Sequence, residues 1–349
     1  MSSNVHDIRG ASHPLDKFAR PLHDLRISVM DRCNFRCPYC MPKEQFHEHY
    51  QFLKSNERLS FDEIVRLSKL FAGLGVKKLR LTGGEPLLRN NLADLIGDLT
   101  GIPGIEDIAL TTNGVLLEKH AVDLRANGLK RITVSLDTLD PDVFKRLSGG
   151  FGALDQVLGG IDAAIAAGLA PVKVNAVIER GVNDAGALDL IEHFRGTPVI
   201  VRFIEFMDVG NRNHWRPTMV VPSVELVERV KARWPMQPVS PNYRREVAER
   251  WRFDDGAGEL GFISSVSQPF CGACSRARLS SEGKFYTCLF ATQGIDLRAP
   301  LRAGATDAEL LSIIRGVWSG RVDRYSEQRE QLRNSDKDAK KIEMYYIGG

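Results

Sequence analysis

Short apolar runs recur along the first two thirds of the chain, and each has the length and residue pattern of a β-strand. They cover residues 25–30, 78–81, 107–110, 131–136, 172–178 and 199–207. Between them, apolar residues repeat every three or four positions, as in amphipathic helices, at 61–74, 92–99, 116–127, 154–167 and 185–194. This alternation predicts an α/β fold in which parallel strands are covered by helices.

A different pattern begins near residue 215. Prolines at positions 217, 222, 235, 238 and 241 surround one amphipathic helix at 223–233. Short strand-like runs continue to residue 299, and a helix capped by Thr306 is expected at 307–318. A charged run at 323–341 is expected to form a solvated helix or arm. The sequence therefore predicts a separate C-terminal region packed against the α/β part.

The first 22 residues mix charge, proline and histidine, and they predict a mobile N-terminal arm. The expected division is thus an arm at 1–22, an α/β part at 23–215 and a C-terminal region at 216–349. The arm contains no apolar signal-like stretch, and no later run is long enough to cross a bilayer. We therefore expect a cytoplasmic protein without a membrane partner.

The composition is that of an ordinary globular protein, with 43% hydrophobic and 26% charged residues. The 47 Lys and Arg residues nearly balance the 44 Asp and Glu residues, which leaves a net charge of +3. Nucleic-acid binders usually carry a large basic excess, so this balance argues against such a partner. Any anionic ligand must be held by a local group of cations.

Cys33, Cys37 and Cys40 form a C-x3-C-x2-C motif directly after the first apolar run. Three thiolates are one ligand short of a closed zinc site or an ordinary four-iron cluster. The motif therefore suggests an iron-sulfur cluster whose fourth iron is open to another ligand. The alternative is a structural zinc site completed by a histidine, with His47 or His49 nearest.

The other three of the six cysteines, Cys271, Cys274 and Cys288, form a second set that is again one ligand short. A thioredoxin-like dithiol is the alternative for the C-x-x-C pair, but it requires a preceding strand and a following helix. Pro269 precedes this pair and a strand-like Arg-Ala-Arg-Leu run follows it. A second cluster, with its open iron facing a substrate, is the favoured interpretation.

Polar and glycine-rich segments follow the expected strands at the positions where each one ends. Thr-Gly-Gly-Glu-Pro occupies 82–86, Thr-Thr-Asn-Gly occupies 111–114, Ser135 and Asp137 close the fourth strand, and Met207 closes the sixth. Such residues also end strands in proteins of every kind. Because α/β barrel enzymes build their active sites at the carboxyl ends of the strands, we expect these segments to meet the first cysteine set on one rim.

Arg276 and Arg278 are two positions apart, so on a strand their side chains would point to the same side. Paired guanidinium groups bind phosphate or carboxylate well, although a solvated edge strand would also carry this pattern. Arg26, Arg80 and Lys173 add cations on other expected strands. A polyphosphate would satisfy all five cations.

The C-x3-C-x2-C motif resembles the signature of the radical S-adenosylmethionine enzymes. With the Gly-Gly-Glu-Pro segment, the Cys-Gly-x-Cys-Ser-Arg-x-Arg segment and the terminal Gly-Gly, the chain from about Leu22 to Gly349 resembles the GTP 3′,8-cyclase family of molybdenum cofactor biosynthesis. This resemblance implies an incomplete (β/α)6 TIM-like barrel with a C-terminal α+β extension. It also implies two 4Fe-4S clusters, one on each cysteine set.

The resemblance further assigns residues to each ligand. The expected contacts to S-adenosylmethionine are Tyr39, Gly84, Ser135 and Met207. The expected contacts to GTP are Arg26, Arg80, Thr111, Lys173, Arg276, Ala277 and Arg278. The tail ending in Gly348 and Gly349 is expected to enter the active-site cavity.

The implied reaction converts GTP to 3′,8-cyclo-7,8-dihydro-GTP, and no side chain acts as a nucleophile. A 5′-deoxyadenosyl radical, formed by reductive cleavage of S-adenosylmethionine, takes hydrogen from C3′ of the ribose, and the C3′ radical adds to C8 of guanine. One electron and a proton then quench the product radical. The implied partners are a reductase or flavodoxin-type electron donor and the next enzyme, cyclic pyranopterin monophosphate synthase, with the chain as a monomer or homodimer. The alternatives are a peptide-modifying radical enzyme and a two-cluster electron carrier without catalytic activity.

Overall fold

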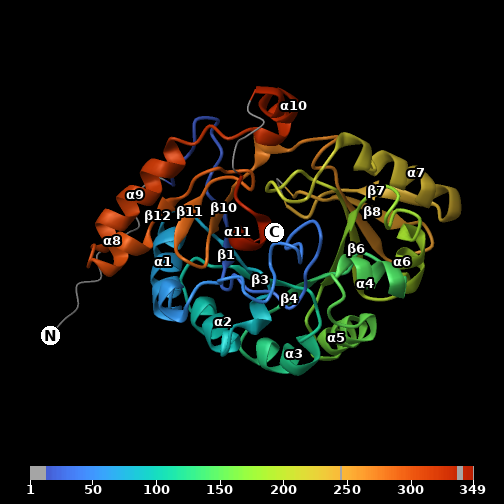
Figure 1. Ribbon diagram of the computed structural model, residues 1–349, viewed down its shortest axis with the longest axis horizontal. Helices are drawn as coiled ribbons and strands as arrows, with labels where there is room; N and C mark the ends of the chain where they lie inside the picture. Colours follow the sequence, from blue (N-terminus) through green and yellow to red (C-terminus); the bar gives the residue numbers. More distant parts are fainter. Residues whose placement is uncertain (1–12, 244–245, 336–340, 349) are drawn as a thin grey trace.

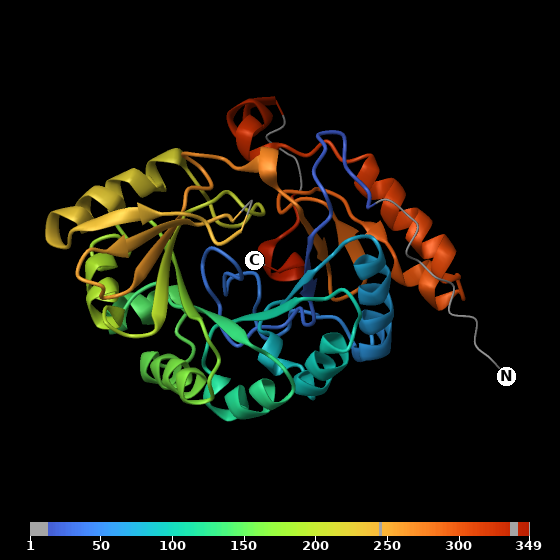
Figure 2. The same ribbon diagram turned by 180° about the vertical axis from the view of Figure 1, so that it is seen from behind.

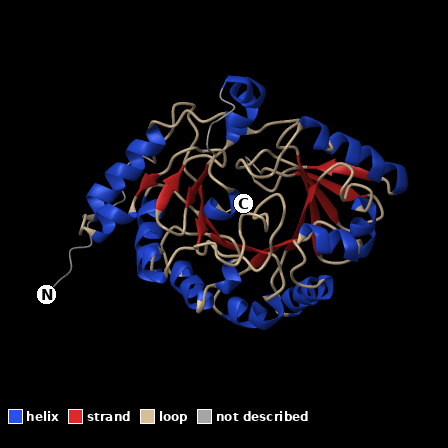
Figure 3. Cartoon of the chain, viewed as in Figure 1, coloured by secondary structure: helices blue, strands red, loops and turns tan. Residues whose placement is uncertain are grey.

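The computed structural model describes residues 13–243, 246–335 and 341–348. Within these residues the strands form one sheet of twelve strands in the order β12-β11-β10-β1-β2-β3-β4-β5-β6-β9-β8-β7. The sheet curves around the centre of the molecule, and helices α1, α2, α3 and α5 lie along its outer side (Figures 1 and 3). The short C-terminal helix lies inside the curve, as both Figure 1 and the reverse view in Figure 2 show.

The middle of the sheet consists of six parallel strands in chain order. They are β1 (Asp24–Ser28), β2 (Lys78–Thr82), β3 (Asp107–Thr112), β4 (Arg131–Ser135), β5 (Val172–Ile178) and β6 (Val199–Glu205). The helices that connect them are α1 (Phe61–Gly73), α2 (Leu92–Thr100), α3 (Leu117–Ala126), α4 (Pro141–Leu147), α5 (Leu154–Ala166) and α6 (Ala187–Phe194). The predicted strands and helices of this part are confirmed, whereas α4 was not predicted.

Strand β5 shows why the alternating pattern gives this architecture. Val172, Val174, Ala176 and Ile178 are buried, while the residues between them are only partly buried. Successive side chains of a strand point to opposite faces of the sheet. One face of β5 therefore packs into the apolar core, and the other face, with its polar residues, is turned toward the centre of the curve.

Helix starts follow the local sequence. The Ser60 hydroxyl accepts a hydrogen bond from the Glu63 backbone N–H at the start of α1, and the Glu63 carboxylate accepts one from Ser60. Helix α4 begins with Asp140 as cap and proline in the first turn. Its seven residues are too few for a helical period to stand out in the sequence, which explains why it was missed.

The C-terminal part joins the sheet on both sides instead of forming a separate body. Strand β10 (Arg276–Leu279) pairs with β1, and β9 (Glu259–Ile263) pairs with β6, both in parallel. The sheet is completed by β7 (Met236–Val239), β8 (Glu249–Phe253), β11 (Lys284–Tyr286) and β12 (Ile295–Asp296). The helices of this part are α7 (Ser223–Arg233), α8 (Arg298–Arg302), α9 (Asp307–Ser319), α10 (Tyr325–Ser335) and α11 (Met344–Ile347). Strands of the C-terminal region therefore extend the same sheet, and the predicted division near residue 215 falls between β6 and α7.

Two terminal predictions need correction. Part of the expected N-terminal arm packs against the protein, because Asp16, Arg20 and Leu22 are buried, although Leu15 and Phe18 are exposed; residues 1–12 lie outside the described part. Of the charged run expected at 323–341, Tyr325–Ser335 form α10, which is not simply solvated, and residues 336–340 lie outside the described part. Arg329 is buried and its Nε donates to Asp208 Oδ1 at 2.8 Å.

Other details of the C-terminal part agree with the sequence. Thr306 caps α9 by accepting a hydrogen bond from the Glu309 backbone N–H. In the described part of the chain, no helix has the length and apolar character needed to cross a membrane.

Candidate functional site

A cavity of about 390 Å³ lies at the centre of the curved sheet. All six cysteines contribute to its wall, together with the carboxyl ends of the parallel strands. The two cysteine sets are far apart in the sequence but meet here because β10, which follows Cys274, pairs with β1, which precedes Cys33. The structure thus brings the predicted rim residues and both cysteine sets to one place.

The first cysteine set lies on a tight loop after β1. The backbone N–H groups of Cys40 and Met41 both donate to the Cys37 carbonyl, at 3.0 and 2.8 Å. The Phe35 N–H donates to Cys33 Sγ at 3.4 Å, and the Asn113 amide lies 3.8 Å from the same sulfur. Burial raises the pKa of the Cys33 thiol to about 12, with Glu85 adding to the shift.

The Gly-Gly-Glu-Pro segment packs directly against this loop through its backbone. The Gly84 N–H donates to the Met30 carbonyl and the Glu85 N–H donates to the Arg32 carbonyl, both at 2.7 Å. A Cβ atom on Gly84 would lie 2.2 Å from the Arg32 carbonyl oxygen. Glycine is thus required here for contact with the cysteine loop itself.

The other expected contacts to S-adenosylmethionine, namely Tyr39, Ser135 and Met207, all line the cavity, as Gly84 does. The Tyr39 hydroxyl donates to Asp137 Oδ2 at 2.7 Å, which ties the cysteine loop to the end of β4. Burial raises the pKa of Asp137 to about 6, although hydrogen bonds from Tyr39 and Val177 oppose the shift. These side chains form the end of the cavity next to the first cysteine set.

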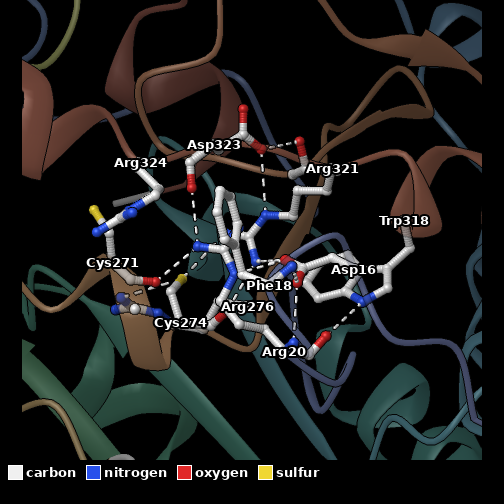
Figure 4. Close-up of polar contacts among 12 residues, drawn as sticks. Asp16, Phe18, Arg20, Cys271, Cys274, Arg276, Trp318, Arg321, Asp323 and Arg324 are labelled. Atoms are coloured by element: carbon white, nitrogen blue, oxygen red, sulfur yellow. Dashed lines mark hydrogen bonds and ion pairs between the residues drawn. The ribbon is translucent and has the colours of Figure 1, made fainter.

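Guanidinium groups lie around Cys271 and Cys274, the two cysteines of the second set labelled in Figure 4. Arg276 Nη2 lies 3.6 Å and Arg321 Nη2 lies 3.4 Å from Cys274 Sγ. Burial raises the pKa of the Cys274 thiol, but Arg276 and Arg321 outweigh it and bring that pKa down to about 6. The Phe290 N–H donates to Cys288 Sγ at 3.5 Å.

The cysteines fit iron-sulfur clusters better than the alternatives do. All six are free thiols that are partly buried, and both sets receive N–H donors at sulfur, a common feature of cluster ligands. A zinc site is not supported, because no three Cys, His, Asp or Glu side chains of the described residues are grouped around a single ion. The His49 side chain, one of the two histidines nearest to the first set, is 82% exposed. The thiolates of a four-iron cluster bind to separate irons, so such a cluster does not require them to be grouped around one ion.

Four of the expected GTP contacts form a row of cations across neighbouring strands. In the sheet register Arg26 lies beside Arg80 on one side and beside Arg278 on the other, and Arg276 follows on the same face of β10. All four line the cavity. Burial lowers the pKa of Arg80 to about 10, with Arg131 adding to the shift, and burial with Arg276 lowers that of Arg278 to about 10.

The remaining expected GTP contacts differ in their placement. Thr111 lines the cavity and accepts a hydrogen bond from Arg80 Nη1 at 2.9 Å. Lys173 lies on β5 one pleat before Asn175, on the same face, but only Asn175 contributes to the cavity wall. Ala277 is fully buried in the apolar core, so its side chain lies on the opposite face of β10.

The tail also reaches the cavity. Arg278 Nη1 donates to the carbonyl of Ile347 at 3.3 Å and also to that of Gly348. A Cβ atom on Gly348 would collide with Thr82 at the end of β2. Entry of the tail is thus observed as far as Gly348, and Gly349 lies outside the described residues.

Sequence reasoning missed two arginines of this site. Arg202 lines the cavity from β6 and its Nε donates to Asn175 Oδ1 at 2.9 Å; a cation between the buried Val201 and Phe203 was a signal for it. Arg321 follows α9 and contacts Cys274, but no motif surrounds it. Only the tertiary structure reveals its position.

Comparison with known families gives two matches that together span most of the chain. Residues 27–194 match the Radical SAM superfamily, and residues 199–327 match the family described as Molybdenum Cofactor Synthesis C. A curated relative from Xanthomonas campestris pv. campestris strain 8004, named GTP 3′,8-cyclase, is 54% identical over 334 residues, covering 96% of this chain and 97% of the relative. One from Acidothermus cellulolyticus with the same name is 50% identical over 356 residues, covering 96% and 98%.

Similar solved structures agree on the fold. Streptococcus suis SuiB bound to S-adenosylmethionine has a TM-score of 0.58 at 15% identity, covering 87% of this chain and 69% of that chain. At this identity the likeness concerns the fold alone.

Proposed function

The chain belongs to the GTP 3′,8-cyclase family of radical S-adenosylmethionine enzymes, and from this membership we propose that it converts GTP to 3′,8-cyclo-7,8-dihydro-GTP in molybdenum cofactor biosynthesis. The observation that carries the proposal is the row of guanidinium groups of Arg26, Arg80, Arg276 and Arg278 beside the second cysteine set. Four clustered, partly desolvated cations are costly unless an anion compensates them. A nucleoside triphosphate supplies that anion.

In this proposal Cys33, Cys37 and Cys40 hold one 4Fe-4S cluster, and Cys271, Cys274 and Cys288 hold the other. When bound, the first supplies the electron that cleaves S-adenosylmethionine, and the second offers an open iron to the guanine of GTP. The fit rests on the free thiols, the N–H donors at sulfur and the cavity that both sets share.

Tyr39, Gly84, Ser135 and Met207 are proposed to orient S-adenosylmethionine at the end of the cavity near the first set. This end is bordered by the carboxylates of Glu85 and Asp137. A positive sulfonium group is better tolerated there than among the arginines at the other end. The distribution of charge along the cavity therefore favours one orientation of cofactor and substrate.

The substrate contacts are proposed to divide between two tasks. Arg276 and Arg278, with the backbone at Ala277, would hold the triphosphate, while Arg26, Arg80 and Thr111 would fix the nucleoside. Lys173 lies two residues before Asn175 on β5 and is not part of the cavity wall, so it would act on GTP mainly through its charge. Holding the ribose in place is the main contribution of such residues, because a misplaced reacting atom costs far more rate than affinity.

The fold fits the same proposal. The six parallel strands β1 to β6 would form an incomplete (β/α)6 barrel, and the strands added at either side would carry the second cluster. The division near residue 215 is then one of function: residues 23–215 would hold S-adenosylmethionine and fix the nucleoside of GTP, and residues 216–349 would hold the second cluster and the triphosphate. A cytoplasmic location, an external electron donor and transfer of the product to cyclic pyranopterin monophosphate synthase belong to the same proposal.

An anaerobic assay tests the activity. The protein is reconstituted with iron and sulfide, reduced with dithionite, and supplied with S-adenosylmethionine and GTP, and the products are followed by mass spectrometry. We expect 5′-deoxyadenosine and a cyclised guanine product in equal amounts, both dependent on GTP.

Other outcomes separate the alternatives. Formation of 5′-deoxyadenosine without conversion of GTP would reject the substrate and favour a peptide-modifying enzyme. Absence of 5′-deoxyadenosine from protein that contains both clusters would reject the reaction and favour an electron carrier.

A further inference from the structure

A buried network of charges lies directly behind the second cysteine set (Figure 4). Asp16 Oδ2 accepts from Arg20 Nε at 2.6 Å and lies 3.4 Å from Arg321 Nη1. The exposed fractions of these side chains are 0% for Asp16, 1% for Arg20 and 2% for Arg321. The segment before β1 thus supplies the carboxylate that holds two arginines against the cysteines.

Both arginines fix the backbone that carries the cysteines. Arg20 Nη1 donates to the Cys271 carbonyl at 2.7 Å and to the Asp323 carbonyl at 2.9 Å. Arg321 Nη1 donates to the Cys274 carbonyl at 2.8 Å, and its Nη2 lies 3.4 Å from Cys274 Sγ. The two ends of the C-x-x-C segment are therefore held by two different guanidinium groups.

Further contacts limit the movement of Arg321. Its Nε donates to Asp323 Oδ2 at 3.2 Å, and the same carboxylate oxygen accepts from the Thr287 hydroxyl at 2.6 Å. Its guanidinium lies over the Trp318 ring, 4.7 Å from the centroid. Hydrogen bonds and an aromatic ring thus hold the Arg321 guanidinium, so its position next to the Cys274 sulfur is fixed before any ligand binds.

Arg321 differs in this respect from Arg276, the other guanidinium at Cys274. Arg276 lies on β10 in the row of cations proposed to bind the triphosphate, so a ligand would redistribute its hydrogen bonds. Arg321 is almost completely enclosed by protein and already bonded to Asp16, Asp323 and Cys274. Its charge acts on the sulfur whether or not a substrate is bound.

We propose that Arg321 is a positioning residue that raises the reduction potential of the second cluster, and that Asp16 and Arg20 hold it in place. The inference rests on the proposed function, because it needs a cluster on Cys271, Cys274 and Cys288. Reduction adds negative charge to a cluster, and a fixed cation that hydrogen-bonds a ligating sulfur stabilises this reduced state. Removing the cation therefore lowers the potential.

The test compares Arg321→Gln, Arg321→Lys and Arg315→Gln in the full chain with both clusters reconstituted. Arg315 lies on α9 outside the cavity wall and serves as the matched control. The midpoint potential of each cluster is measured by redox titration with electron paramagnetic resonance. Signals are assigned with variants in which one cysteine set is replaced by alanine.

Arg321→Gln is expected to change the ratio of oxidised to reduced second cluster by at least about tenfold at a fixed potential, a fall of about 59 mV for one electron. Arg321→Lys keeps the charge without the planar fork and should give a smaller fall. Arg315→Gln should leave both potentials unchanged. The first cluster should keep its potential in every variant.

Asp16→Asn tests the supporting part of the network. If its main effect is to release Arg321, the second potential should fall by less than in Arg321→Gln, whereas loss of the buried Asp16 charge alone would raise it. In the double variant only that rise should remain relative to Arg321→Gln. A purely structural role of Asp16 would instead add to the effect of Arg321→Gln.

An unchanged second potential in Arg321→Gln protein with full iron content would overturn the inference, as would equal shifts of both clusters. If Arg321→Gln protein fails to assemble the second cluster, the test relies on Arg321→Lys. A second-cluster potential in that variant above the wild-type value would overturn the inference. A wild-type protein that never binds a second cluster would reject the proposed function instead.

Discussion

The two cysteine sets provide the same donors to one cavity, yet the charges beside Cys274 are opposite to those beside Cys33 and Cys37. Within the second set this is particular to Cys274, because burial and Asp323 raise the pKa of Cys288 to about 12. Next to Cys33 and Cys37 lie the carboxylates of Glu85 and Asp137, which add to the effect of burial in raising the pKa of these thiols. Next to Cys274 lie Arg276 and Arg321, which outweigh burial and lower the pKa of that thiol to about 6. Identical ligands thus occupy two different electrostatic environments.

The loops are also held by partly different means. The first is held by backbone contact with Gly83 and Gly84, where no side chain fits, and by Arg36, whose Nη1 donates to the Cys33 carbonyl at 2.8 Å. The second is held by guanidinium groups that bond its carbonyls and one sulfur. The number of thiols in each set therefore predicts a cluster, whereas the charges beside each set indicate which ligand binds at that end of the cavity. These ligands are a sulfonium cofactor at one end and a polyphosphate at the other.

The largest effect is expected from removing one cysteine of each set. Cys40→Ala should abolish all 5′-deoxyadenosine formation, at least about a 1,000-fold loss, because three thiolates are needed to hold the first cluster. Cys288→Ala should abolish GTP conversion but leave slow, GTP-independent formation of 5′-deoxyadenosine. Each variant should lose about four iron atoms per chain. Iron analysis and mass spectrometry check this; equal loss of 5′-deoxyadenosine in both variants would mean that the two sets do not differ in function.

The next effect concerns the glycines of the two loops. Gly84→Ala would place Cβ 2.2 Å from the Arg32 carbonyl oxygen, whereas at Gly272 the nearest atom is Glu327 Oε1 at 3.7 Å. We expect Gly84→Ala to reduce turnover about 100-fold, as displacement by an ångström does. Gly272→Ala should retain wild-type turnover within about twofold, because ordinary contact distances are kept. Steady-state kinetics on matched iron-loaded samples checks this, and a tolerated Gly84→Ala would show that the backbone contact is dispensable.

Removal of the triphosphate arginines should have a smaller effect, confined to the second end of the cavity. Arg276→Ala or Arg278→Ala should each weaken GTP binding roughly 10- to 150-fold, since a hydrogen bond to a charged group contributes about 1.5–3 kcal/mol. The Kd for S-adenosylmethionine should stay unchanged. Equilibrium dialysis with each ligand measures both values. Arg252→Ala, an exposed arginine paired with Glu259, is the control, and equal weakening of both ligands would contradict the division of the cavity.

The smallest effect is a pH dependence at Lys173. Burial, with Arg202 adding to the shift, lowers the pKa of Lys173 from 10.5 to about 7. The cation is therefore present below pH 7 and lost above it, so the Kd for GTP should rise between pH 6.5 and 8, by at most about eightfold, the limit at which only the protonated form binds. Lys173→Met should lack this rise. Dividing the Kd of the wild type by that of the variant at each pH removes the contribution from the titration of GTP itself. An identical pH profile in both proteins would exclude a charge effect of Lys173.

The same residue links pH to stability. Because its pKa is lower in the folded state than in the unfolded state, the unfolded chain binds more protons between pH 7 and 10.5. The free energy of unfolding should then rise with pH across that window in the wild type and less so in Lys173→Met. Chemical denaturation at several pH values measures the slope, and equal slopes would contradict the shifted pKa.

The sequence by itself determined the local and periodic features of this protein. The six parallel strands of the middle of the sheet, the helices α1, α2, α3, α5 and α6, and the cap at Thr306 follow from patterns that lie within a few residues of one another. Both cysteine sets, the glycine-rich rim and the Arg276–Arg278 pair were recognisable for the same reason. Short spacing fixes which side chains share a loop or a face.

Only the tertiary structure decided which distant segments meet. The pairing of β1 with β10 joins the two cysteine sets, and no local pattern encodes it. The same is true of Asp16, Arg20 and Arg321, which come from opposite ends of the chain and lie in segments expected to be an arm and a helix end. Buried ion pairs depend on long-range packing that brings the charges together and excludes water. The environment of the second cysteine set, and hence its difference from the first, is therefore a property of the fold.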